Sequence, residues 1–285
     1  MSMSRSKTRS LVGIMIALAL PAAAATKNCK YTAAPHSTVS IVNEFGNVDV
    51  KVASGRQVNI AATPASDKVT VECNQVGSRI DAISHLQQTD ATSGRVDYEL
   101  SVPADVALSI RNSAGPIHVN GAGDDDTLRS DAAEVDASNL HNAHLHVVTI
   151  NGPVNLKSIS GGHIEVLSSG GAVSLDNVDA QRVSVSTTTG NISYDGDFGS
   201  GGEYSFNNHS GNIDVTVPAS ASIDVDARSL QGSVQNDLPL HQKSAAVAPA
   251  VTGSSYGRSF AGTSNSGSSS VELRSFSGTI RVKKR

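Results

Sequence analysis

The chain has 285 residues, of which 4% are aromatic and none is tryptophan, and its formal net charge is −4. A domain that binds nucleic acid normally carries a surplus of basic residues, so this charge argues against a nucleic-acid partner. Charged residues make up only 17% of the chain, and its length is sufficient for one or two domains with a substantial core.

The first 25 residues have the three parts of a secretory signal peptide. Arg5, Lys7 and Arg9 precede a ten-residue apolar run at 11–20, and a proline and four alanines follow it. A helix that spans a membrane needs about 20 apolar residues, so this run is too short to be an anchor. The leader holds three of the 22 basic residues and none of the 26 acidic ones, so the remainder has a net charge of −7. We therefore expect a secreted, periplasmic or cell-envelope protein without a membrane span after cleavage.

Cys29 and Cys73 are the two cysteines of the chain, and both lie beyond the leader. In an oxidising compartment, an even number of cysteines usually forms disulfides. A bridge between them would close a loop of about 44 residues, which in the chain-entropy model stabilises a fold by about 4 kcal/mol. The sequence therefore predicts a disulfide that pins an N-terminal segment of strands and cap at 26–110.

A short pattern recurs along the chain: glycine, any residue, an aliphatic residue, any residue, and a second aliphatic or aromatic residue. It occurs at 46–50, 115–119, 152–156, 162–166, 171–175, 190–194, 211–215 and 278–282. Gly152, Gly171 and Gly190 are 19 residues apart, and the next intervals, to Gly211 and Gly232, are 21 residues. Alternation of this kind after a glycine is typical of a short strand that follows a turn.

Five apolar positions stay in register when the units that begin at 152 and 171 are superposed. The pairs are Val154 with Val173, Leu156 with Leu175, Ile159 with Val178, Ile164 with Val183, and Val166 with Val185. A repeat of about 20 residues is typical of a solenoid whose coils bury their apolar faces by stacking about 4.8 Å apart. We therefore expect an all-β fold, a parallel β-solenoid (β-helix) with coils of about 19–21 residues over 111–285. An antiparallel sandwich is the alternative, since it also uses short, closely spaced strands.

The two ends of the chain depart from this repeat. Ile80, Ile83 and Leu86 recur three residues apart within 78–88, which predicts a short helix in an N-terminal cap. Residues 239–270 are rich in serine, alanine, glycine and proline, which indicates a flexible insertion before the last strands.

Three segments together resemble a known bacterial family. They are VDYELSVPADVALSIRNSAGPIHV at 96–119, SGNIDVTVPASASIDVDARSLQGSV at 210–234 and SGTIRVKKR at 277–285. They combine a Val-Pro-Ala turn, a strand with alternating apolar residues, and a next strand that begins with glycine followed by an aliphatic residue. This combination resembles the putative-adhesin family of β-strand repeats, which is related to autotransporter adhesin head domains. The resemblance covers most of residues 40–285. It implies a secreted or envelope-associated binding module of unknown function, without established catalytic residues.

Histidines gather on two neighbouring coils of the predicted solenoid. His144, His146, His163 and Glu165 alternate with apolar residues that face inward, so we expect these four side chains to point outward. Imidazole nitrogens and a carboxylate on coils about 4.8 Å apart could share Zn²⁺ or Cu²⁺. A polar outer face that is merely rich in histidine is the alternative, and no other cofactor is expected.

Two further motifs do not indicate a site. Residues 253–257 match Gly-x-Ser-x-Gly, but that motif needs a strand before it and a helix after it, and here it lies in a serine- and glycine-rich loop. The three aspartates at 124–126 lack the spacing of known calcium loops, which favours an exposed acidic corner.

One outward row bears on the possibility of an enzyme. It reads Asp136, Asn155, Ser174, Ser193 and Asp214, one residue from each of five successive coils. Two acids that far apart cannot act on one glycosidic bond. We expect a non-enzymatic module that binds an envelope or extracellular protein or glycan. A carbohydrate-active enzyme, a lyase or hydrolase on a β-helix, is the alternative.

Overall fold

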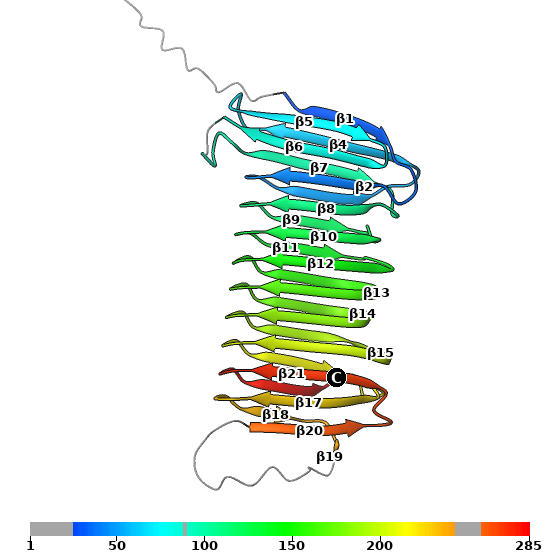
Figure 1. Ribbon diagram of the computed structural model, residues 1–285, viewed down its shortest axis with the longest axis vertical. Coiled ribbons are helices and arrows are strands. Elements are labelled where there is room, and N and C mark those ends of the chain that lie inside the picture. The colour runs from blue at the N-terminus through cyan, green and yellow to red at the C-terminus, as the bar shows by residue number, and fades with distance from the viewer. Residues whose placement is uncertain (1–24, 88–89, 243–257) are drawn as a thin grey trace, which may run out of the picture.

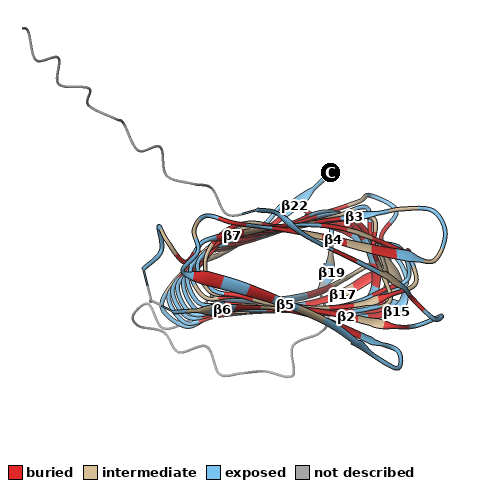
Figure 2. Cartoon of the chain, turned by 90° about the horizontal axis from the view of Figure 1, so that it is seen from above, coloured by how far each residue is buried: buried red, intermediate tan, exposed pale blue. Residues whose placement is uncertain are grey.

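The computed structural model describes residues 25–87, 90–242 and 258–285, and in this part of the chain every regular element is a strand. The strands stack along one axis (Figure 1) and form two opposite walls, which we call face A and face B (Figure 2). Face A consists, in stacking order, of β5 (Val69–Val76), β6 (Arg79–Leu86), β2 (Thr38–Asn43), β8 (Ala107–Asn112), β10 (Asp125–Ser130), β12 (Ala143–Thr149), the second halves of β13 (Val154–Ser168), β14 (Val173–Thr187) and β15 (Ile192–Asn208), β21 (Ser269–Ser275), β17 (Ile223–Ser229), β20 (Arg258–Ser264) and β19 (His241–Gln242). Face B consists of β1 (Lys27–Thr32), β4 (Gln57–Pro64), β7 (Val96–Val102), β3 (Val48–Val52), β9 (Ile117–Asn120), β11 (Val135–Ser138), the first halves of β13, β14 and β15, β16 (Ile213–Val217), β22 (Ile280–Lys284) and β18 (Val234–Asn236).

The predicted register of the central coils is confirmed. β13 and β14 pair in parallel, and all five predicted apolar pairs, from Val154 with Val173 to Val166 with Val185, lie opposite each other. All ten side chains are buried, at most 1% exposed. Valine, isoleucine and leucine from the two walls thus form one continuous core, which no single coil could bury alone.

The predicted helix at 78–88 is wrong, because residues 79–86 form strand β6. β6 pairs in parallel with β2 on one side and antiparallel with β5 on the other. Ile80, Ala82 and Ser84 face inward with a period of two, whereas Ile83 is only half-buried. Tertiary pairing of the backbone on both sides outweighs the three-residue spacing of the apolar residues.

The stacking order differs from the chain order at both ends. The coil of β2 and β3 lies between β6 and β7 on one side and β8 and β9 on the other, so the stack includes residues 38–52. The last coil, β21 and β22, lies between the coil of β15 and β16 and that of β17 and β18. The coil that begins at Gly232 was expected to stack directly on the one at Gly211. Instead, Gly278 of the last coil separates them.

The predicted flexible insertion at 239–270 is corrected in part. β20, at 258–264, pairs antiparallel with β17 and with the short β19, and β21 begins at Ser269. Residues 243–257 lie outside the described residues. The antiparallel β20 covers the edge of β17, which would otherwise present unpaired backbone groups at the end of the stack.

The predicted disulfide between Cys29 and Cys73 is present, with the two Cα atoms 6.5 Å apart. Cys29 lies on β1 and Cys73 on β5, the outermost strands of face B and face A at the N-terminal end. The bridge therefore ties the two walls together where the stack would otherwise be open.

A polar ladder runs along one corner of the coils. Thr149, Ser168 and Thr187 are buried, and each hydroxyl donates to the carbonyl of the glycine three residues later. A Cβ atom on the glycine at 171 would lie 1.9 Å from the carbonyl oxygen of Gly152 in the preceding coil, so this approach requires glycine. The pattern Ser/Thr-x-x-Gly thus satisfies backbone groups at these three turns.

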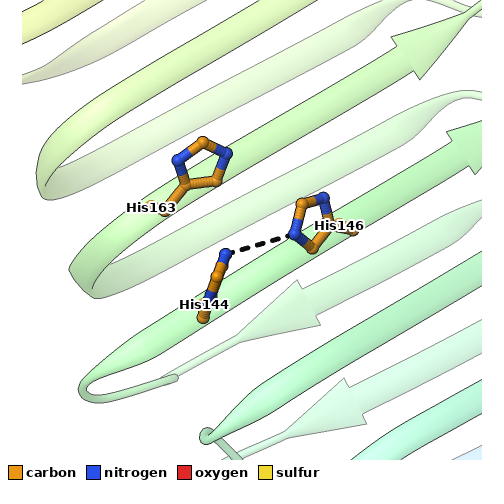
Figure 3. Close-up of side chains that lie close together, drawn as sticks. All are labelled: His144, His146 and His163. Carbon is orange, nitrogen blue, oxygen red and sulfur yellow. Dashed lines mark hydrogen bonds between the residues drawn. The ribbon is translucent and has the colours of Figure 1, made fainter.

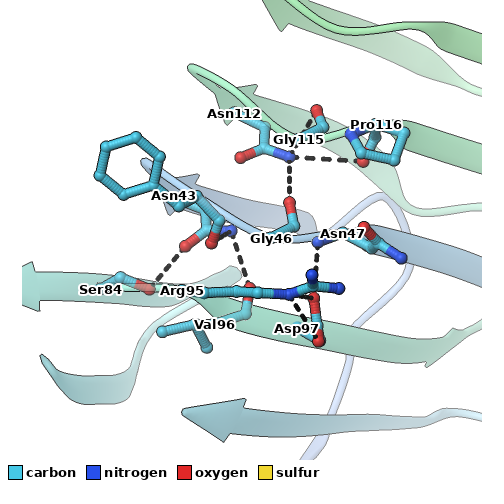
Figure 4. A network of polar contacts seen from close by, with 11 residues as sticks. Asn43, Gly46, Asn47, Ser84, Arg95, Val96, Asp97, Asn112, Gly115 and Pro116 are labelled. Atoms are coloured by element: carbon cyan, nitrogen blue, oxygen red, sulfur yellow. Dashed lines mark hydrogen bonds and ion pairs between the residues drawn. The ribbon is translucent and has the colours of Figure 1, made fainter. Parts of the chain in front are cut away.

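The same corner near the N-terminus uses asparagine (Figure 4). Asn112 donates to the carbonyls of Gly46 and Gly115, at 2.8 Å each, and so ties two coils. Asn43 donates to the carbonyl of Val96 at 3.0 Å. These buried amides replace hydrogen bonds that the strands cannot make where the chain turns.

Candidate functional site

Parallel pairing brings the predicted histidines together on face A. His144 on β12 lies opposite His163 on β13, and His146 lies opposite Glu165. Leu145 and Val147 alternate with them and are buried, so the four polar side chains point outward, as the sequence predicts.

The three imidazoles form one compact group (Figure 3). The Nε2 atoms of His144 and His146 are 3.2 Å apart, and the ring of His163 lies 5.1 Å from that of His144 and 5.4 Å from that of His146, centre to centre. One nitrogen from each of the three rings lies within 4.8 Å of the others. The group therefore offers three nitrogen donors on a surface open to solvent.

Glu165 contacts the group from the side. Its Oε2 lies 2.8 Å from Nδ1 of His146, the nitrogen that faces away from His144. A carboxylate accepts a hydrogen bond here, so Nδ1 of His146 carries the proton and Nε2 holds a free lone pair. His141, on the same coil, instead lies beside Ser160, with Nδ1 3.2 Å from its hydroxyl.

Burial and neighbouring charges favour the neutral form of His163. Partial burial lowers the pKa of His163, and the nearby His144, His146 and Arg182 lower it further, against the opposing effect of Glu165. Arg182 lies opposite His163 on β14, and its Nε is 2.9 Å from Glu203 of the next strand. An unprotonated imidazole is the form that can donate a lone pair to a metal ion.

The aspartates at 124–126 do not form the exposed corner that the sequence suggested. Asp126 faces inward and is only 1% exposed, and its Oδ1 accepts a 2.9 Å hydrogen bond from the backbone N–H of Leu108. Burial raises the pKa of Asp126 to about 7. Asp124 instead pairs with His36 at 2.8 Å. The period-two alternation of β10 predicts this inward position, because Leu128 on the same strand is also buried.

The outward row on face B consists of the predicted residues. Asp136, Asn155, Ser174, Ser193 and Asp214 lie opposite one another in successive coils. Asp136 accepts from the Asn155 amide at 2.7 Å and lies 3.2 Å from His118, while Asp214 pairs with Lys283 at 3.0 Å. Each acid at the two ends of this row is thus held by its own partners.

A groove that the sequence did not suggest lies near the N-terminal end of face B. Its volume is about 620 Å³, and β1, β3, β4 and β7 each contribute to its walls. The polar lining includes Lys30, Asp49, Lys51, Asn59 and Glu99. These residues come from four separate parts of the chain and share no motif, so only the pairing of the strands reveals the groove.

Several predictions fall on residues that the structure does not describe. Residues 1–24 of the predicted leader and the Gly-x-Ser-x-Gly match at 253–257 are among them. None of the described residues belongs to a helix with the length and apolar character needed to cross a membrane.

The stacked coils define a bacterial β-repeat domain, and comparison with known proteins places it in a family. The model of the Toastrack DUF4097 family matches residues 36–283, and the chain belongs to this family. The predicted resemblance to the bacterial putative-adhesin domains of unknown function is thereby confirmed. No curated protein matches the chain.

Two solved structures are similar to this chain. A putative adhesin from Bacteroides fragilis NCTC 9343 has a TM-score of 0.50 and 12% identity, and the match covers 92% of this chain and 99% of that one. A putative cell adhesion protein from Clostridium sporogenes ATCC 15579 has a TM-score of 0.28 and 10% identity, over 92% of this chain and 100% of that one. At these identities, the comparison with the Bacteroides structure shows the fold alone.

Proposed function

We propose that the protein is a secreted or envelope-associated, non-enzymatic module that binds a protein or glycan of the cell envelope or the exterior. The observation that carries this proposal is the regular stack, which holds outward polar side chains in straight rows on a rigid surface. Family membership and the adhesin description of the Bacteroides structure support a binding role.

The groove on face B is our candidate for the contact surface. It is concave, and it places Lys30 and Lys51 beside Asp49 and Glu99. Mixed charges of this kind suit a polar partner better than an apolar one. The disulfide holds one wall of the groove, because Cys29 lies among its lining residues.

The outward row from Asp136 to Asp214 does not support the alternative that the protein is a carbohydrate-active enzyme. Asp136 and Asp214 are four coils apart, which corresponds to about 19 Å at the spacing of paired strands. Glycosidases use two carboxyl groups about 5–10 Å apart. Each acid also has a nearer partner, His118 for Asp136 and Lys283 for Asp214.

The test is retention of envelope fractions and purified envelope glycans on the immobilised chain. We expect saturable retention of one fraction, reduced by Lys51→Glu in the groove. Lys157→Glu is the matched control, because Lys157 is an exposed lysine on the same face, outside the groove. If both variants weaken retention equally, the groove is not the contact surface. Depolymerisation of a glycan by the chain, or no saturable retention at all, would overturn the binding role.

A further inference from the structure

We propose that His144, His146 and His163 bind one Zn²⁺ ion on face A, with Glu165 as the positioning residue. The inference goes beyond the proposed binding role and does not depend on it. It starts from the pairing of β12 with β13, which fixes the backbone beneath the three rings. Two ligands come from one coil and the third from the next, so the site exists only when the coils are stacked.

The distances within the group fit a small ion. Zinc is bound by histidine nitrogen at about 2.0–2.1 Å in tetrahedral geometry, which places two ligand atoms about 3.3–3.4 Å apart. The Nε2 atoms of His144 and His146 are 3.2 Å apart, close to that value. One nitrogen of His163 lies within 4.8 Å of a nitrogen of each other ring, a separation that a rotation of its partly exposed ring can shorten.

The protonation states also fit. Glu165 accepts the Nδ1 proton of His146, which leaves Nε2 as an acceptor for the Nε2 proton of His144. A carboxylate that holds the distal nitrogen of a ligating histidine is the usual second contact of a zinc site.

The surrounding charges tolerate a cation. Arg182 lies opposite His163 in the next coil, but its guanidinium is turned to Glu203 at 2.9 Å. On the other side, Asp125 lies opposite His144. Three imidazoles leave the fourth tetrahedral position to water or to a donor from a bound partner. The same donors bind Cu²⁺ more tightly than Zn²⁺ by the general order of stability.

The experiment is isothermal titration calorimetry of the full chain, without a polyhistidine tag and after treatment with a chelator. With ZnCl₂ as titrant we expect one ion per chain, and a melting temperature that rises with the zinc concentration. His163→Ala is expected to abolish binding, because it removes the ligand from the second coil. Glu165→Gln keeps all three ligands and is expected to weaken binding by about 10- to 100-fold.

His118→Ala is the matched control. His118 is a surface histidine paired with an aspartate, but on face B, and its loss should leave zinc binding unchanged. Equal melting temperatures of all variants in chelator would show that the fold is intact. No saturable zinc binding by the parent chain would overturn the proposal, as would unchanged binding by His163→Ala. Unchanged binding by Glu165→Gln would remove the positioning role of Glu165.

Discussion

Asp126 introduces an ionisable group into the apolar core, and Asp126→Asn should change how stability depends on pH. The carboxyl group lies opposite Leu145 on the neighbouring coil and is 1% exposed. Its Oδ1 is held by the backbone N–H of Leu108, while Oδ2 has no partner among the described residues. An asparagine keeps the acceptor and the shape but cannot ionise.

The magnitude follows from the pKa of Asp126, which burial raises from an ordinary 3.8 to about 7. Because the folded value is above the unfolded one, the parent chain is fully stabilised below about pH 4 and loses this stability as the pH rises through 7. A difference of about three pKa units corresponds to about 4 kcal/mol, an upper bound because the protein can relax around the charge. We therefore expect Asp126→Asn to be more stable than the parent at pH 8 by up to about 4 kcal/mol, and the gap to close near pH 4.

The assay is guanidinium unfolding of both chains, followed by far-ultraviolet circular dichroism between about pH 4 and pH 8. Asp125→Asn is the control, since Asp125 is the exposed neighbour on the same strand and should change stability by less than about 0.5 kcal/mol. Parallel pH profiles for the parent and Asp126→Asn would refute the reasoning, because they would mean that the carboxyl titrates alike in the folded and unfolded chains.

Three further predictions concern the stack, each measured by chemical unfolding. Val173→Asp should lower the free energy of unfolding by more than about 4 kcal/mol, because it buries an unpaired charge. Ser174→Asp, which points outward, should change it by less than about 0.5 kcal/mol, and similar losses for the two variants would disprove the register. Gly171→Ala should lower the free energy of unfolding by about 3 kcal/mol, because its Cβ would collide with the carbonyl oxygen of Gly152 in the preceding coil. Gly162→Ala should be tolerated, because a Cβ there meets nothing within 4 Å, and equal effects of the two variants would argue against the close approach of the coils at Gly171. Reduction of the disulfide between β1 and β5 should lower the free energy of unfolding by about 4 kcal/mol, and an unchanged midpoint would contradict that value.

The central coils could be predicted because their information is local. Val154 and Val173 each alternate with polar neighbours and recur at one interval, and parallel strands of equal length have one register that buries every apolar residue. The outward histidines follow from the same alternation. The contact of Glu165 with Nδ1 of His146 could not be predicted, because it depends on how the side chains rotate.

The order in which the last coils stack could not be predicted from the sequence, for a physical reason. The coils that begin at Gly211, Gly232 and Gly278 carry nearly the same pattern, so each could stack on either of the others. The pattern of a coil defines its two faces but not its neighbour. A buried serine, threonine or asparagine three residues before a corner glycine, as in Ser168 before Gly171, is visible in the sequence and would have marked most turns at this corner.

The position of the last coil affects the order in which the fold is completed during synthesis. β17 and β18 leave the ribosome before β21 and β22, yet their parallel partners are these final strands. A chain that has not yet released residues 269–285 therefore has an unfilled gap at this end of the stack. The coils from β8 and β9 to β15 and β16 stack in chain order and can assemble one after another as they emerge, whereas the coil of β17 and β18 gains its parallel partners only after β21 and β22 are free. A chain without residues 269–285 would remain open at that gap and would expose unpaired strand edges to proteases.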